Sequence, residues 1–292
     1  MRVIHLKNGS INCDIDLQRG ARLTSLRQGL REVIEPVELQ NGLREKHDPS
    51  LGLLAMIPCV HHSSLRELKW TGTGHPHMST MAADPMHDWG VGWQSSWQIL
   101  EQSEDFALLS LEHRAEKNWP WSFDASQTIH LKPSALSMSL SLTNQSSVSS
   151  PGGLGWAFSL PVDKHDRFSI QANRLIDTHQ QGAPGQLSVG VKENNIDRAL
   201  DLELSMDQLK VGQCMDMRDG TFCVEGAHHR LQFESKLKTV QVKLSEDESS
   251  LVVKVMDLPM QVLEHTSAPP MLAPGESVSV QMSWMLLSVS QA

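Results

Sequence analysis

Strict alternation of apolar and polar residues is the feature that most constrains how this chain can fold. In residues 136–142, leucine and methionine alternate with serine at every second position. The same period recurs in residues 11–17, 240–244 and 278–284. A period of two places successive side chains on opposite faces of a half-buried strand. The chain is therefore predicted to be all-β, with many strands in two packed sheets.

Turn signals divide the chain into short strands. Asn8-Gly9 predicts a hairpin between residues 3–6 and 11–17, with a third strand over 20–26. Residues 33–82 are rich in proline and glycine, so mostly loop with short strands is expected there, and residues 205–210 predict a helical turn. Further strands are expected at 97–100, 106–113, 123–131, 136–142, 240–244, 251–256, 261–266 and 278–284.

Composition narrows the classes of function. The chain has 292 residues and a formal net charge of −9, without a basic cluster, so nucleic acid is not an expected partner. No apolar run approaches the roughly 20 residues of a membrane-spanning helix, and early charges argue against a signal peptide. The cysteines lack a CxxC spacing and suggest reduced thiols in the cytoplasm. They are Cys13, Cys59, Cys214 and Cys223.

Residues 86–97 combine residue types that suit a small-molecule pocket. This stretch holds a histidine, an aspartate, two glycines and three tryptophans. Glycine lets backbone approach a ligand, tryptophan offers a flat apolar face, and histidine moves protons near neutral pH. The stretch is therefore a candidate wall for a polar ring such as a sugar. A surface turn whose tryptophans fill the core is the alternative, because most loops carry no site.

Histidines gather in and just after the long irregular region. His61, His62, His75, His77 and His87 could in principle bind a metal. No carboxylate or cysteine stands at a recognised ligand spacing, so we expect no metal. A metal-dependent enzyme built on these histidines is the weakest of the functional hypotheses.

Glu264 is a candidate for proton transfer. It follows Val262 and Leu263 at the end of a predicted strand. Partial burial there would raise its pKa toward the range of a general base. A solvent-exposed glutamate at a strand end is the other interpretation.

Several short motifs occur in a characteristic order. They are the opening strands through residues 20–23 (GARL), residues 119–123 (WPWSF), 140–144 (LSLTN), 153–156 (GLGW), 263–266 (LEHT) and 274–277 (PGES). In this order they resemble the aldose 1-epimerase (galactose mutarotase) family, nearly from end to end. The resemblance implies one domain over residues 1–292 with a large antiparallel β-sandwich, the galactose mutarotase-like supersandwich.

The resemblance also implies a chemistry. Members of this family interconvert the α and β anomers of a sugar by acid–base ring opening, without a cofactor. By motif, Glu264 corresponds to the base and His87 to a histidine that contacts the sugar. Further substrate contacts are expected from His61, His62, Trp93, Trp156 and Asp219.

Three positions depart from the family pattern. Ala157 stands where the family has its acid histidine, His61-His62 stand where it has Asn-Arg, and Lys210 stands near its sugar-binding aspartate. Histidine does not reproduce the bidentate fork of arginine.

Two hypotheses follow from these departures. The first is an epimerase-like enzyme with Glu264 as base and His87, or else His61 or His62, as acid. The second is a non-catalytic carbohydrate-binding or regulatory protein, because Ala157 cannot move a proton. Either way the expected partner is a small sugar or sugar derivative, and the protein is expected to be a monomer or homodimer that binds neither nucleic acid nor membrane.

Overall fold

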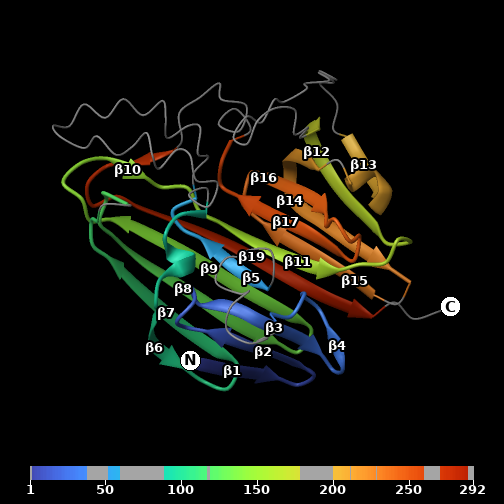
Figure 1. The fold of residues 1–292 in the computed structure, drawn as a ribbon, viewed down its shortest axis with the longest axis horizontal. Coiled ribbons are helices and arrows are strands. Elements are labelled where there is room, and N and C mark those ends of the chain that lie inside the picture. Colours follow the sequence, from blue (N-terminus) through green and yellow to red (C-terminus); the bar gives the residue numbers. More distant parts are fainter. Residues whose placement is uncertain are drawn as a thin grey trace.

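Strands dominate the fold. The structure is a computed structural model that describes residues 2–37, 52–59, 89–116, 119–177, 200–210, 212–227, 229–259 and 270–288. Within these ranges the helical elements are two 3₁₀ turns, η2 (Gly92–Gln94) and η3 (Met206–Leu209). Hydrogen bonds join 17 of the strands into one network that folds into two layers (Figure 1). The all-β prediction is confirmed.

The first layer is a meander extended by C-terminal strands. Its neighbouring strands pair antiparallel in the order that follows. They are β6 (Gln98–Gln102), β7 (Phe106–His113), β8 (Phe123–Lys132), β9 (Ala135–Asn144), β19 (Ser277–Ser288), β15 (His229–Ser235) and the second half of β14 (Gln213–Gly226).

The second layer begins with the N-terminal hairpin and is also antiparallel. Its order is β1 (Val3–Asn8), β2 (Ile11–Asp16), β3 (Arg22–Gln28), β5 (Leu53–Met56), β11 (Gly155–Pro161), β17 (Ser250–Met256), β16 (Thr239–Leu244) and the first half of β14.

The remaining strands lie at the margins. The short β4 (Arg31–Glu32) pairs with β3, and β12 (Arg167–Asp177) pairs with β13 (Leu200–Ser205) and with both halves of β14. Because β14 pairs with β16 at one end and with β15 at the other, it joins the two layers. A separate ribbon consists of β10 (Ser150–Pro151) and β18 (Met271–Leu272).

Aromatic rings connect the layers through the main core. Phe158 on β11 stands 4.5 Å from Trp284 on β19, measured between ring centroids. Phe158 also stacks on Phe233 of β15 at 5.5 Å, and Phe233 in turn stacks on its cross-strand partner Phe222 of β14 within the first layer. These residues alternate with outward-facing ones along each strand, so the period of two in the sequence places the core between the layers.

Most predicted strands are confirmed within a residue or two. The Asn8-Gly9 hairpin is β1–β2, and residues 106–113 form β7 as expected. The expected helical turn at 205–210 is η3. The strand expected at 261–266 lies outside the described residues, as does most of the 33–82 region, of which β5 is the described strand of four residues.

Two further expectations concern the cysteines and the membrane. The four cysteines are buried thiols and form no disulfide in the part of the chain that the structure describes. Within the same residues, no helix is both long and apolar enough to span a bilayer.

Candidate functional site

Ala157 lies on the side of the second layer that faces away from the main core. Its cross-strand partners are Leu54 on β5 and Lys254 on β17. Directly opposed residues on neighbouring strands share a face, so these side chains form one row. Met56 and Met256 continue the same face two residues along. We call this outer side of β5, β11 and β17 the site face.

A small apolar cluster covers the site face. It is separate from the main core and brings two tryptophans from the 86–97 stretch, Trp89 and Trp93, against Ala157. Ala157 is only 1% exposed as a result. The complete cluster is Leu54, Met56, Cys59, Trp89, Trp93, Ala157, Met256 and Leu258.

Close backbone packing holds the tryptophan segment in place. Gly90 has a φ of +72°, and a Cβ there would collide with the carbonyl oxygens of Ile57 and Pro58. The Ile57 amide donates to the Trp89 carbonyl at 3.1 Å, and the Gly92 amide donates to the Ile57 carbonyl at 2.9 Å. Glycine in this stretch therefore lets two backbone segments meet, where the sequence suggested an approach to a ligand.

The glycines before Trp156 serve the same purpose. The Cys59 amide donates to the Gly153 carbonyl at 2.6 Å. A Cβ on Gly153 would collide with the Cys59 carbonyl and come within 2.8 Å of Leu258. The chain therefore makes a tight crossing at this point, with no room for a side chain.

Lys254 is the charged side chain of this row. It is partly buried, and its ammonium nitrogen stands 4.8 Å from the ring centroid of Trp89. This is cation–π geometry. Among the described residues, no carboxylate lies within ion-pair distance of it. Sequence reasoning missed Lys254, although a lysine inside the apolar run of residues 251–256 was a visible signal.

Among the predicted site residues that the structure describes, Trp93 and Trp156 lie on opposite sides of the second layer. Trp93 belongs to the cluster around Ala157. Trp156 is fully buried in the main core, on the opposite face of β11 from Ala157. His61, His62, His87 and Glu264 lie outside the described residues, as do His75 and His77.

Asp219 occupies an exposed irregularity between the two halves of β14. Its Oδ1 accepts hydrogen bonds from the Thr221 amide at 3.0 Å and from the Thr221 hydroxyl at 2.9 Å. These hydrogen bonds to Thr221 fix the Asp219 carboxylate locally, and its role in substrate binding stays a prediction.

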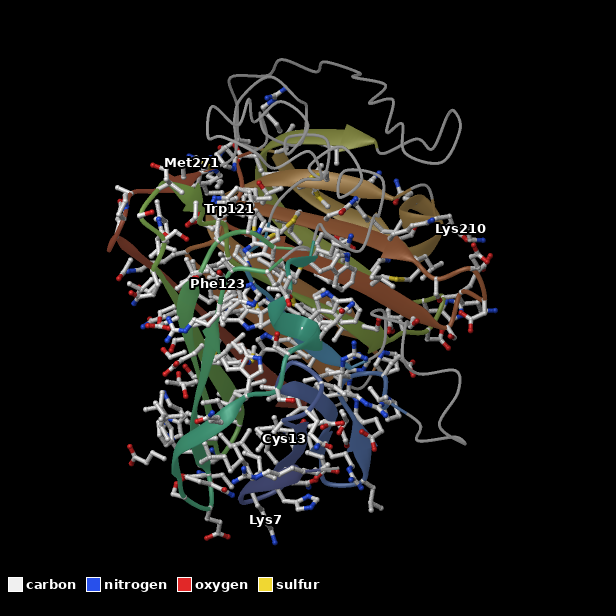
Figure 2. The ribbon with its side chains drawn as sticks, turned by 60° about the vertical axis from the view of Figure 1, so that its left-hand side comes forward. Lys7, Cys13, Trp121, Phe123, Lys210 and Met271 are labelled. Atoms are coloured by element: carbon white, nitrogen blue, oxygen red, sulfur yellow. The ribbon has the colours of Figure 1, made fainter. Side chains whose placement is uncertain are left out.

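Lys210 is tied to a different part of the surface. Its ammonium contacts Glu248 at 2.7 Å and Asp207 at 3.0 Å, and it lies at the edge of the molecule beside η3 (Figure 2). The hydrogen bond to Glu248, followed by that to Asp207, raises the pKa of Lys210 above its ordinary value.

Metal binding stays a prediction to be tested by experiment. No group of three histidine, cysteine or carboxylate side chains is placed to hold a metal ion within the described ranges. The five histidines that raised the question lie outside those ranges.

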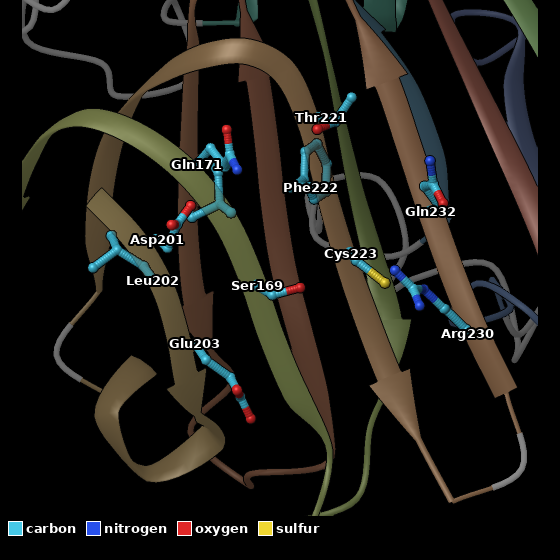
Figure 3. A pocket seen from close by; sticks show the side chains of 11 residues that line it. Ser169, Gln171, Asp201, Leu202, Glu203, Thr221, Phe222, Cys223, Arg230 and Gln232 are labelled. Carbon is cyan, nitrogen blue, oxygen red and sulfur yellow. The ribbon is translucent and has the colours of Figure 1, made fainter. Parts of the chain in front are cut away.

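A separate pocket of about 400 Å³ lies over β12–β15 (Figure 3). Cys223 and Arg230 point toward each other at one side of it, and Gln171, Asp201 and Glu203 line the other (Figure 3). Burial raises the pKa of the Cys223 thiol, and the nearby Arg230 guanidinium opposes that shift only in part. A thiol held protonated is a poor nucleophile, so this shift does not favour a reactive Cys223.

Three segments with predicted chemistry join the described fold at the site face. Cys59 precedes His61 by two residues, and Trp89 follows His87 by two. Leu258, which leads toward Glu264, belongs to the same apolar cluster as Cys59 and Trp89. The described ends of these three segments therefore pack against one another at the site face.

Comparison with known proteins identifies relatives along the whole chain. A family model described as aldose 1-epimerase matches residues 2–283. An uncharacterised Escherichia coli K12 protein, YphB, is 26% identical over 186 residues, which is 64% of this chain and 61% of that protein. The chain thus spans less than two thirds of the length of this relative.

Solved structures show the same fold. A galactose mutarotase-like protein from Lactobacillus casei superposes with a TM-score of 0.75 at 16% identity, covering 98% of this chain and 100% of that one. A galactose 1-epimerase from Lactobacillus acidophilus gives a TM-score of 0.65 at 10% identity, covering 98% and 94%. The galactose mutarotase-like architecture that the motifs predicted is confirmed, and at these identities the likeness concerns the fold alone.

Proposed function

Because the chain belongs to the aldose 1-epimerase family, we propose that it binds a sugar on the site face and interconverts the sugar's α and β anomers. The reaction consists of proton transfers, so it needs no cofactor. The proposal treats residues 1–292 as one domain.

The observation that carries this proposal is the convergence around Ala157. One cluster contains Cys59, Trp89 and Leu258. Each of these residues adjoins, along the chain, one of the segments that hold His61, His87 and Glu264. Two positions along the chain span at most about 7 Å, which applies to His61 and His87, and the six positions from Leu258 to Glu264 span at most about 21 Å. This supports a site in which a base and an acid meet a sugar beside Trp89 and Trp93.

Each candidate has a distinct role in the proposed reaction. Glu264 removes the proton of the anomeric hydroxyl, and His87 delivers a proton to the ring oxygen. The ring opens, the aldehyde rotates, and the ring closes on the other face with the proton transfers reversed. His87 carries the acid role because the methyl group of Ala157 holds no exchangeable proton.

Exchange spectroscopy tests the proposal directly. The wild-type protein should accelerate α–β exchange of at least one aldose or sugar phosphate, measured by NMR magnetisation transfer between the anomeric protons. Glu264→Gln should reduce that acceleration by at least 100-fold, in the range that general acid–base catalysis contributes. Glu234→Gln, an exposed change on β15, is the matched control and should leave it unchanged. The proposal fails if no sugar exchanges faster with the wild-type protein than in buffer.

A non-catalytic sugar-binding protein is the second candidate, and the surroundings of Ala157 favour it. Leu54, Met256 and the two tryptophans share a cluster with Ala157. Among the described residues, the titratable groups in or next to this cluster are the Cys59 thiol and the Lys254 ammonium. Such a protein would bind sugar saturably in calorimetry while leaving the exchange rate at its value in buffer. Heat of binding together with accelerated exchange would rule this candidate out.

A further inference from the structure

We propose that the ligand of the site face is an anionic sugar, whose phosphate or carboxylate group pairs with the Lys254 ammonium. This inference rests on the proposed sugar-binding function and adds the chemical class of the ligand. The two anionic groups share the chemistry that matters here, namely oxygens that carry a negative charge and accept hydrogen bonds.

The strand register places Lys254 next to Ala157, the position at which the family has its acid histidine. Lys254 on β17 is the cross-strand partner of Ala157 on β11. Its other partner is Gln241 on β16, so the three residues form one row across the site face. Neighbouring strands lie about 4.8 Å apart. A ligand that binds at the edge of the cluster beside Trp89 is therefore within reach of the flexible lysine side chain.

Among the described residues, none supplies a counter-charge to Lys254. Apolar side chains, including Leu54 and Met256, dominate the cluster beside it. Within the described ranges its one marked polar interaction is with the face of Trp89, at 4.8 Å. Withdrawing an ammonium group from water is costly unless an anion or hydrogen-bond acceptors replace the water, and a cation–π contact offsets only part of that cost. An anionic ligand would provide the missing partner.

A second donor in the same cluster points the same way. The indole N–H of Trp93 is buried and has no acceptor among the described residues. Trp93 packs in the cluster that contains Ala157. Ammonium and indole groups only donate hydrogen bonds, so together they favour a ligand rich in acceptor oxygens. A neutral sugar offers hydroxyls, whereas a phosphate or carboxylate offers oxygens that only accept.

Calorimetry with three sugars tests the inference. Glucose 6-phosphate, glucuronate and glucose are titrated into the wild-type protein. At least one anionic sugar should bind about tenfold more tightly than glucose, as expected for a charge-assisted hydrogen bond. Its affinity should fall as salt is raised, while that of glucose should not. Preference for the phosphate or for the carboxylate identifies which anionic group the site takes.

Matched variants assign the effect to one side chain. Lys254→Met keeps an unbranched apolar stem and should lower the affinity for the anionic sugar to that for glucose. Lys254→Arg retains the charge and should retain the preference. Lys7→Met, at an exposed position on β1 near the far end of the molecule (Figure 2), should change nothing. Thermal melts confirm that each variant is folded, and the salt dependence of the wild type tests the charge without any mutation.

The outcomes separate this inference from the proposed function. If glucose binds as tightly as both anionic sugars, or if Lys254→Met keeps the preference, the inference is overturned while sugar binding stands. If the wild-type protein binds none of the three sugars, the proposed function fails and the inference fails with it.

Discussion

Replacing Ala157 with histidine should destabilise the protein and should not create a working acid. The methyl group is 1% exposed and has Leu54 and Lys254 as cross-strand partners. Inserting a larger side chain into a packed cluster typically costs about 1–3 kcal/mol. In a domain of this size each kcal/mol lowers Tm by about 2–4 °C. The expected loss is therefore about 2–12 °C, measured by calorimetry or by circular dichroism.

Electrostatics argue against restored acid catalysis. Burial disfavours a charged imidazolium, and the Lys254 ammonium on the adjacent strand disfavours it further. Both effects would hold the pKa of the inserted imidazole below about 6.5, the value for an unperturbed histidine. At pH 7 such a group is neutral and has little tendency to protonate a ring oxygen. The variant should exchange anomers no faster than the wild type.

A second alanine provides the control. Ala135 begins β9 and is partly exposed, so Ala135→His should change the stability by no more than about 0.5 kcal/mol. The reasoning would be refuted if Ala157→His melted within 1 °C (~0.5 kcal/mol) of the wild type and also accelerated exchange. That result would mean the position is open and lacks only its proton donor.

Two further predictions concern the stability of the fold. Burial raises the pKa of the Cys13 thiol to about 12. The buried neutral thiol therefore makes its full contribution to the free energy of unfolding below the pKa of the unfolded chain, and this contribution declines as the pH rises toward the folded pKa. Between pH 8 and 10 the wild type should lose about 1–2 kcal/mol more stability than Cys13→Ala in urea titrations, and parallel pH profiles would contradict this. Gly220 has a φ of +75° and its Cβ would strike the Ser235 carbonyl oxygen, whereas Gly9 has a φ of +57° and open space around it. Gly220→Ala should therefore cost about 2–5 kcal/mol, from backbone strain and the steric clash together, and Gly9→Ala about 1 kcal/mol. Equal losses would count against the close approach.

The layers of the fold could be predicted because the strands are amphipathic. Residues 136–142 bury leucine and methionine on one face of β9 and carry serine on the other. Antiparallel layers with one solvated face require that pattern. The pairing of strands that are far apart in the sequence was harder to predict. Nothing in the alternation of β9 says that it pairs with β19, which lies more than 130 residues later.

The candidate site was predicted less completely, and β11 shows why. Trp156 and Ala157 were both connected with the site on the basis of one motif. Consecutive residues of a strand point to opposite faces, so at most one of them can line the site face, and that residue is Ala157. Applying the period of two to this motif would have placed Trp156 in the core.

Lys254 shows the opposite error. Residues 251–256 were predicted as a strand, and the lysine within this apolar run received no functional interpretation. Its position beside Ala157 depends on the register between β11 and β17, which separates the two residues by almost a hundred positions in the sequence. Register is set by tertiary packing. The charge was visible in the sequence, but its neighbour was not.

A crystal structure of the protein soaked with glucose and, separately, with glucose 6-phosphate would test the central claim most directly. We predict electron density for a sugar ring on the site face, beside Trp89 and Trp93, with the phosphate near Lys254. A sugar found only in the pocket over β12–β15 (Figure 3), or no bound sugar with either soak, would contradict the account.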